Sequence, residues 1–330
     1  ALFVLMAYGQ EKKFALYSVA FYNMENLFDT IHDEGKNDYE YLPNGTNQWN
    51  TMKYKAKLKN MSEILSMLST DKLPMGPAII GVSEIENYRV LEDILKQPAL
   101  ADRGYQYVHY EGADQRGVDC AFFYNPKLFE LTNSKLVPYV YINDTVHKTR
   151  GFLIASGNIA GEKMHFIVNH WPSRAAASPV RERAGEQVRA IKDSLLREDS
   201  AAKIVIMGDM NDDPMDKSMA VALGAKRKPA DVGPTDLYNP WWDTLKKGYG
   251  TLMYKGKWNL FDQIVFTGNL LGTDRSTLKF YKHEIFRRDF MFQKEGKYKG
   301  YPKRTQAGGV WLNGYSDHLP TIIYLIKEVK

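Results

Sequence analysis

Two short segments of the sequence place a carboxylate beside a second polar side chain at the end of an apolar run. Asp209 and Asn211 follow one such run, and Asp317 and His318 precede another. A carboxylate held there can take a proton from water, and an amide can donate a hydrogen bond to a phosphoryl oxygen. The segments therefore predict an active site at one edge of a sheet, although Asp and Asn also suit ordinary turns.

Asp262 is the expected partner of His318. It opens the otherwise apolar segment 262–266, where an unpaired carboxylate would be costly. A histidine that works as an acid or base near neutral pH needs such a partner to stay in one tautomer. The alternative interpretation is that His318 lies on the surface and that Asp262 belongs to a turn.

Three further apolar runs end in polar side chains of the same kind. One is followed by His170 and then Arg174, whose side chains can donate hydrogen bonds to a phosphate. Another ends at Glu84, which suits Mg²⁺ because this ion binds a few carboxylates together with water and phosphate oxygens. The first run ends at Asn23. Each of these strand ends is weak evidence alone, but turns do not readily explain six segments with one pattern.

The elements that position these residues are mostly strands. Helices are predicted over 52–68, 88–96 and 179–196 from apolar residues at three- and four-residue spacing. Because strands outnumber helices and the helices lie in long connections, we expect an α+β sandwich with helices on its outer faces, formed by one domain over 10–330. The expected strands, rich in Val, Ile, Phe and Tyr, are 16–22, 78–82, 105–110, 120–124, 151–155, 164–168, 203–207, 262–266 and 321–326.

Composition narrows the class of protein. The 330 residues are 44% apolar and 25% charged, as in a globular protein, and the net charge of +5 favours anionic partners. The single cysteine, Cys120, excludes a disulfide framework and a cysteine-rich zinc site. No apolar run is long enough to predict a membrane-spanning helix.

The first nine residues are apolar and include small residues at Ala7 and Gly9, before a charged segment. This pattern predicts the remnant of a signal peptide, and hence an exported protein in the periplasm or the extracellular space. A first β-strand is the alternative.

The motif residues, taken in order, resemble the endonuclease/exonuclease/phosphatase superfamily, which includes deoxyribonuclease I, abasic-site endonucleases, inositol-polyphosphate 5-phosphatases and neutral sphingomyelinases. The resemblance extends from about residue 15 to 326. It implies a deoxyribonuclease I-like, four-layer α/β/β/α sandwich with the site at one rim. It also implies hydrolysis of phosphoesters that depends on Mg²⁺, with Mn²⁺ as an alternative. The residues that carry it are Asn23 with Glu25, Glu84, 116–119, His170, Asp209 with Asn211, Asp262, and Asp317 with His318.

The resemblance implies a role for each acidic and amide residue. Glu84 resembles the principal metal ligand, assisted by Asn23 and Asp317. Asp209 resembles the acid that orients or deprotonates the attacking water, or else handles the leaving oxygen. Asn211 would hold the scissile phosphate.

It also implies roles for the basic side chains. His318, oriented by Asp262, and His170 would stabilise charge on the phosphoryl oxygens or supply a proton. Arg116 and Arg174 are expected to contact phosphate on the substrate side. The chain departs from the family pattern at two positions, with Ser83 before Glu84 where Gln is common and Gln263 after Asp262 where Arg is frequent.

Three functions remain open for such a protein. A monomeric nuclease acting on DNA or RNA is the first, supported by the basic and aromatic stretch 286–304, whose lysines could follow a nucleic-acid backbone. The second is a phosphatase or phospholipase C-type phosphodiesterase acting on inositol phosphates, lipid headgroups or another phosphorylated small molecule. Its candidate membrane-docking segment is 240–242, where an aromatic pair also suits a core. The third is a binding scaffold without activity.

Overall fold

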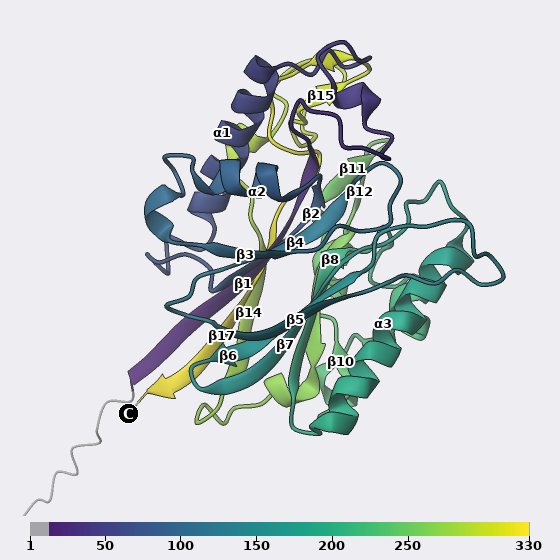
Figure 1. Ribbon diagram of the computed structural model, residues 1–330. Coiled ribbons are helices and arrows are strands. Elements are labelled where there is room, and N and C mark those ends of the chain that lie inside the picture. The colour runs from purple at the N-terminus through teal and green to yellow at the C-terminus, as the bar shows by residue number, and fades with distance from the viewer. Residues whose placement is uncertain (1–12, 330) are drawn as a thin grey trace, which may run out of the picture.

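Two β-sheets form the centre of the computed structural model, which describes residues 13–329 (Figure 1). The first sheet has the strand order β14-β17-β1-β2-β4-β3, and the second β5-β6-β7-β8-β13-β10-β9. The strands of the first sheet are β1 (Lys13–Leu27), β2 (Ile79–Ile85), β3 (Gln106–His109), β4 (Asp119–Tyr124), β14 (Lys279–Ile285) and β17 (Thr321–Val329).

The strands of the second sheet are β5 (Glu130–Val137), β6 (Phe152–Ile159), β7 (Glu162–His170), β8 (Lys203–Asp209), β9 (Ala225–Lys226), β10 (Leu237–Tyr238) and β13 (Asp262–Thr267). Two small hairpins pair β11 (Leu252–Tyr254) with β12 (Lys257–Asn259), and β15 (Gln306–Ala307) with β16 (Val310–Trp311). The helices are α1 (Thr51–Met67), α2 (Tyr88–Leu95), α3 (Ser178–Glu198) and the short α4 (Trp242–Lys246).

Alternation along the strands separates the layers. On β1, Val19 and Phe21 pack toward the second sheet, whereas Ala20 and Tyr22 pack with apolar residues of α1 and α2. On β8, Val205 lies between the sheets and Ile206 packs with α3. Figure 1 shows α1 and α2 on one outer side of the sheets and α3 on the other. The expected four-layer α/β/β/α sandwich is therefore confirmed.

Helix ends follow local sequence signals. The side chain of Asn50 caps α1 by accepting a hydrogen bond from the N–H of Lys53, and Pro179 occupies the first turn of α3. The three predicted helices and all nine predicted strands form. Sequence patterns did not reveal β5 and β14, because these are edge strands without a fully buried residue, and their polar and charged side chains interrupt the apolar pattern.

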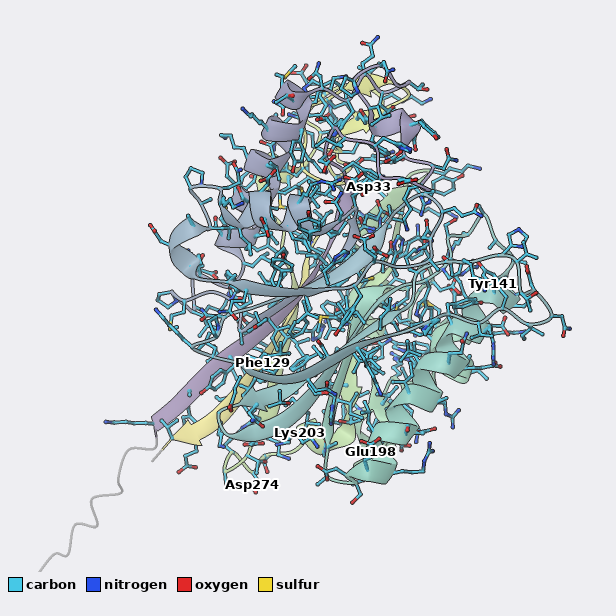
Figure 2. The ribbon with its side chains drawn as sticks, in the orientation of Figure 1. Asp33, Phe129, Tyr141, Glu198, Lys203 and Asp274 are labelled. Atoms are coloured by element: carbon cyan, nitrogen blue, oxygen red, sulfur yellow. The ribbon has the colours of Figure 1, made fainter. Side chains whose placement is uncertain are left out.

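The order of the strands brings the predicted site residues to one rim. Parallel β7 and β8 pair His170 with Asp209, and antiparallel β13 pairs Asp262 with Asp209. In Figure 2, Asp33, in the loop after β1, lies in the upper half of the molecule, whereas Lys203, at the start of β8, lies in the lower half. The site therefore forms where β1 and β8 finish.

Residues 1–9, the expected signal-peptide remnant, lie outside the described residues, so export stays a prediction. In the described range 13–329, none of the helices combines the length and the apolar character that crossing a membrane requires.

Candidate active site

Asp209 lies at the centre of a cluster of acids and histidines. Its Oδ2 atom is 3.8 Å from Nε2 of His170 and 3.8 Å from Nε2 of His318, and His170 Nε2 is also 3.7 Å from Oε1 of Glu84. Gly208 allows this approach, because a Cβ there would lie 2.3 Å from the carbonyl oxygen of Asn169 on β7. The predicted strand ends therefore converge in space.

Asn23 joins two of these acids. Its Nδ2 donates to Glu84 Oε1 at 3.1 Å and to Asp209 Oδ2 at 3.0 Å. Its Oδ1 accepts from the N–H of Glu25 at 2.8 Å, which fixes the orientation of the amide. The amide nitrogen of Asn23 therefore faces the acids, and its oxygen is engaged by the backbone.

Glu84 is held in a constrained geometry. Its φ of 60° places it in the left-handed region, which non-glycine residues rarely adopt. The N–H of Asn26 donates to Glu84 Oε2 at 2.8 Å and supports the carboxylate from a second side. Backbone strain of this kind persists where surrounding structure enforces it, and it is common at functional sites.

His318 and Asp262 form the expected pair. The ring nitrogen Nδ1 lies 2.7 Å from Oδ2 of Asp262, a residue with no exposed surface. Ser316 positions the histidine, since its hydroxyl accepts from the N–H of His318 and donates to the carbonyl of Asn23. Burial alone would lower the pKa of His318, but the charges of Asp262 and Asp209 outweigh it and raise that pKa well above the usual value.

The pKa values of Asp209 and His170, the other titratable groups of the cluster, are shifted in opposite directions. Burial raises the pKa of Asp209 to about 7, with the positive charge of His318 opposing and the negative charge of Asp262 adding to the rise. Burial and the charges of Arg150 and Arg116 lower the pKa of His170 well below its usual value. One imidazole is therefore cationic and the other neutral near pH 7, beside an acid that can change its protonation there.

The donor set fits a divalent cation. Glu84, His170 and Asp209 offer ligand atoms that all lie within 4.8 Å of one another, and so do Asp209, Asp262 and His318. Carboxylates of this density suit hard cations such as Mg²⁺ and Mn²⁺. Glu84 is the partly exposed acid of the first group, so an ion and its water could reach it.

Two cations whose contacts sequence reasoning missed, Lys57 and Arg304, pair with Glu25 and Asp317 next to the site. Arg304 bonds Glu25 Oε1 at 2.9 Å and Asp317 Oδ2 at 2.7 Å. Lys57, fully buried on α1, lies 3.8 Å from Glu25 Oε2, which also accepts from the N–H of Thr305. The available signal was the position of Lys57, a charged residue four before Met61 on the apolar face of its helix.

Burial dominates the titration of this group. It raises the pKa of Glu25 to about 7, with Asp317 adding to the rise and Lys57 and Arg304 opposing it. Burial also lowers the pKa of Lys57 to about 8, against the charge of Glu25. Asp317 is thus tied to Arg304 on one side and lies 3.9 Å from Nε2 of His318 on the other.

Two residues expected to contact substrate phosphate already bind groups of the protein. The guanidinium of Arg174 contacts Asp212, Asp213 and Asp216 at 2.8–3.3 Å and lies 4.5 Å from the ring of Phe261. Asn211 donates its side-chain amide to the carbonyl of Trp171 at 3.0 Å.

Arg116 remains available at the edge of the site. Its side chain is half exposed, and its closest acid, Asp114, lies at 3.5 Å. Its charge contributes to the lowered pKa of His170, so it lies on the side of the site where that ring is found.

The stretch 286–304 is less available for stacking on bases than its composition indicates. Phe286 is buried, and Arg287 packs against the rings of Tyr249, Trp258 and Phe292. Three of its lysines remain exposed, at positions 294, 297 and 299. In the segment 240–242, Trp241 is fully buried and donates to the carbonyl of Ile264, as expected for core.

Comparison with known proteins identifies the family. Three solved structures share the fold: an endonuclease/exonuclease/phosphatase family protein and a mannosyl-6-phosphatase, both from Bacteroides thetaiotaomicron, and D. rerio TDP2 complexed with single-stranded DNA product. Their TM-scores are 0.59, 0.57 and 0.54, at 14%, 14% and 15% identity. The alignments cover 97%, 94% and 94% of this chain and 98%, 99% and 99% of those chains.

No curated protein matches the sequence. The conserved pattern of one family, described as the endonuclease/exonuclease/phosphatase family, matches residues 18–327, nearly the whole chain. This protein therefore belongs to the endonuclease/exonuclease/phosphatase family, whose members are hydrolases acting on phosphoester bonds.

Proposed function

We propose that this protein is a Mg²⁺-dependent phosphoester hydrolase and that its substrate is a phosphodiester of DNA or RNA. The observation that carries the proposal is the arrangement of Asp209 between Glu84 and the His318–Asp262 pair. These groups supply an acid for a cation, an acid that titrates near pH 7 and a cationic donor for phosphoryl oxygens.

Glu84 would hold the ion, with Asp317 contacting it through water. A divalent cation there would neutralise charge that develops on the phosphoryl oxygens. Asn23 would act mainly as a positioning residue, because its amide nitrogen bonds both Glu84 and Asp209. Mn²⁺ suits the same oxygen donors.

The other residues account for the proton and the negative charge. The oxygen of a water forms a bond to phosphorus while the bond from phosphorus to the leaving oxygen breaks on the opposite side, and the leaving oxygen takes a proton from solvent. Asp209, with its pKa of about 7, accepts the proton of that water. The imidazolium of His318 donates to a phosphoryl oxygen, and Asp262 keeps it charged and oriented. Neutral His170, whose Nε2 lies 3.8 Å from Asp209 Oδ2, would donate a hydrogen bond to a second phosphoryl oxygen.

Charge and one structural relative support a nucleic-acid substrate. The net charge of +5 and the exposed lysines at 294, 297 and 299 favour a polyanion. D. rerio TDP2, which shares the fold, was solved with a single-stranded DNA product. Under this proposal the lysines contact the backbone, and the packed rings of the 286–304 stretch hold them in place.

A phosphatase acting on a small phosphorylated molecule is the second candidate. A pocket of about 190 Å³ beside Glu25 and Arg304 favours it, since it has room for one small group. The mannosyl-6-phosphatase from Bacteroides thetaiotaomicron shares the fold at a similar level. A lipid-headgroup substrate is less favoured, because the expected docking residue Trp241 is buried in the core.

A substrate panel separates these candidates. We would assay single-stranded DNA, plasmid, RNA, bis(p-nitrophenyl) phosphate, glucose 6-phosphate and phosphoinositide vesicles, each with Mg²⁺, Mn²⁺ or EDTA. The proposal predicts metal-dependent cleavage of nucleic acid that falls steeply with added salt, because binding a polyanion releases counterions. Cleavage of glucose 6-phosphate alone would favour the phosphatase. Absence of hydrolysis across the panel would contradict both.

A further inference from the structure

A small polar pocket opens directly beside the acid cluster. It has a volume of about 190 Å³ and lies between the segment 40–49 and the β15–β16 hairpin. Two of its lining residues also hold the candidate active site: Asn26 donates its N–H to Glu84, and Arg304 bonds Asp317. In Figure 1, β15 lies near the N-terminal segment that precedes α1. The pocket and the acid cluster therefore share a wall.

Most polar side chains of this pocket are free to bind a ligand. Within residues 13–329, no hydrogen bond engages the side chains of Asn26, Glu40, Tyr41, Asn47 or Gln306, all of which line it. The Oε1 atom of Gln306 is among the buried polar atoms that lack a partner there. A buried amide oxygen without a partner is costly unless a ligand or water completes it.

The charge of the pocket argues against its binding a phosphate group in addition to the one at the acid cluster. Among the described residues that line it, Arg304 is the one cation, and its guanidinium is already bound to Glu25 and Asp317. Glu40 adds a carboxylate that would repel an anion. An acyl chain is equally unsuited, because it would leave the amides of Asn26 and Asn47 without hydrogen bonds.

What remains is a ligand that both donates and accepts hydrogen bonds and carries an apolar face. Amide and phenol groups can donate to a hydroxyl or accept from one, and an ionised carboxylate accepts from one. Tyr41 and Trp49 add aromatic surface to the wall. The volume is below the range of sites for drug-sized ligands, so it fits a single ring.

We propose that this pocket binds a hydroxylated sugar ring attached to the phosphate that is hydrolysed beside Glu84. The proposal rests on the proposed function, because the ring is placed relative to that phosphate. The same chemistry occurs in a free sugar phosphate and in the ribose of a nucleotide. Asn47 and Gln306 would select for the ring, because both line the pocket. Neither contacts the acid cluster, so replacing them should affect binding of the ring and not the chemistry at the phosphate.

Binding can be measured without turnover. Isothermal titration of an Asp209→Asn protein with Mg²⁺ would compare glucose 6-phosphate, adenosine 5′-monophosphate, its 2′-deoxy analogue and phenyl phosphate. We expect at least one sugar-bearing compound to bind about tenfold or more tightly than phenyl phosphate, as one or two added hydrogen bonds allow. Preference for glucose 6-phosphate would indicate a sugar phosphate, and preference for the ribonucleotide over its deoxy analogue would indicate ribose. Equal affinity for phenyl phosphate would overturn the proposal.

Substitutions then test the pocket itself. Asn47→Ala and Gln306→Ala, each added to Asp209→Asn, should lower the preference over phenyl phosphate by about tenfold. Asn133→Ala, an exposed residue of β5, is the control and should keep it. Thermal melting would confirm that each variant is folded. A preference that survives both pocket substitutions would also overturn the proposal.

Kinetics of the wild-type protein distinguish this failure from failure of the proposed function. If phosphoester hydrolysis is wrong, no phosphate compound of the panel is cleaved, whatever the titrations show. If only the sugar pocket is wrong, nucleic acid or bis(p-nitrophenyl) phosphate is still cleaved with Mg²⁺, while the titrations show no preference for a sugar-bearing compound over phenyl phosphate.

Discussion

Replacing Asp262 by asparagine should lower activity and shift its whole pH profile toward acid. The substitution keeps the shape of the side chain but removes the charge that lies 2.7 Å from His318 Nδ1. Hydrogen bonds to charged groups contribute about 1.5–3 kcal/mol, which corresponds to a roughly ten- to hundredfold loss of kcat/KM at neutral pH.

The direction of the pH shift follows from the two pKa changes. In the wild-type protein, activity should rise as Asp209 deprotonates through a pKa of about 7 and fall at higher pH, as His318 loses its proton through a raised pKa. Asp262 raises both pKa values, so its neutralisation should move both limbs to lower pH.

The assay is kcat/KM between about pH 5 and about pH 9 on the best substrate of the panel, with thermal melting to verify folding. Asp243→Asn is a matched control, because Asp243 is exposed and pairs with Arg227 away from the cluster. An Asp262→Asn protein with wild-type activity and unshifted limbs would refute the role assigned to the His318–Asp262 pair.

Two predictions concern stability. Lys57→Met should lower the free energy of unfolding by on the order of 3 kcal/mol, because it leaves the buried carboxylate of Glu25 with Arg304 as its remaining cation. Urea unfolding at pH 7 measures this change, and an unchanged unfolding midpoint would contradict the prediction. His283 should make the protein less stable in acid, because burial, aided by the charge of Lys247, lowers its pKa to about 4. Since the unfolded chain binds this proton first, stability should be lost between about pH 6.5 and about pH 4, by about 2 kcal/mol at about pH 5. A His283→Gln protein should lose less over that range, and equal losses in urea unfolding would refute the assignment.

The sequence predicted the layers and the rim because both depend on local patterns. Strand runs ending in Asn23, Glu84, His170 and Asp209 are continuous apolar segments that are buried on both faces, and such strands bring their ends to one edge when they pair in parallel. The acid beside His318 was likewise expected, since Asp262 opens an apolar strand.

The surroundings of the site depend on contacts distant in sequence, which local patterns do not reveal. Arg304 meets Glu25 across 279 positions, and no periodicity in 286–304 indicates that contact. Arg174 was expected to face substrate, yet three acids in 212–216 take its donors. Which cation pairs with which acid is decided by tertiary packing.

The central claim is that Glu84 holds a divalent cation for phosphoester hydrolysis. Its most direct test is a Mg²⁺ titration of activity on bis(p-nitrophenyl) phosphate and on the best panel substrate, for the wild-type protein, Glu84→Gln and the control Glu63→Gln, a partly exposed residue of α1 that pairs with Lys59. We predict saturable, EDTA-sensitive activity in the wild type and the control, and a loss on the order of hundredfold or more in Glu84→Gln. Full Mg²⁺-dependent activity in Glu84→Gln, or wild-type activity that survives EDTA, would contradict the account.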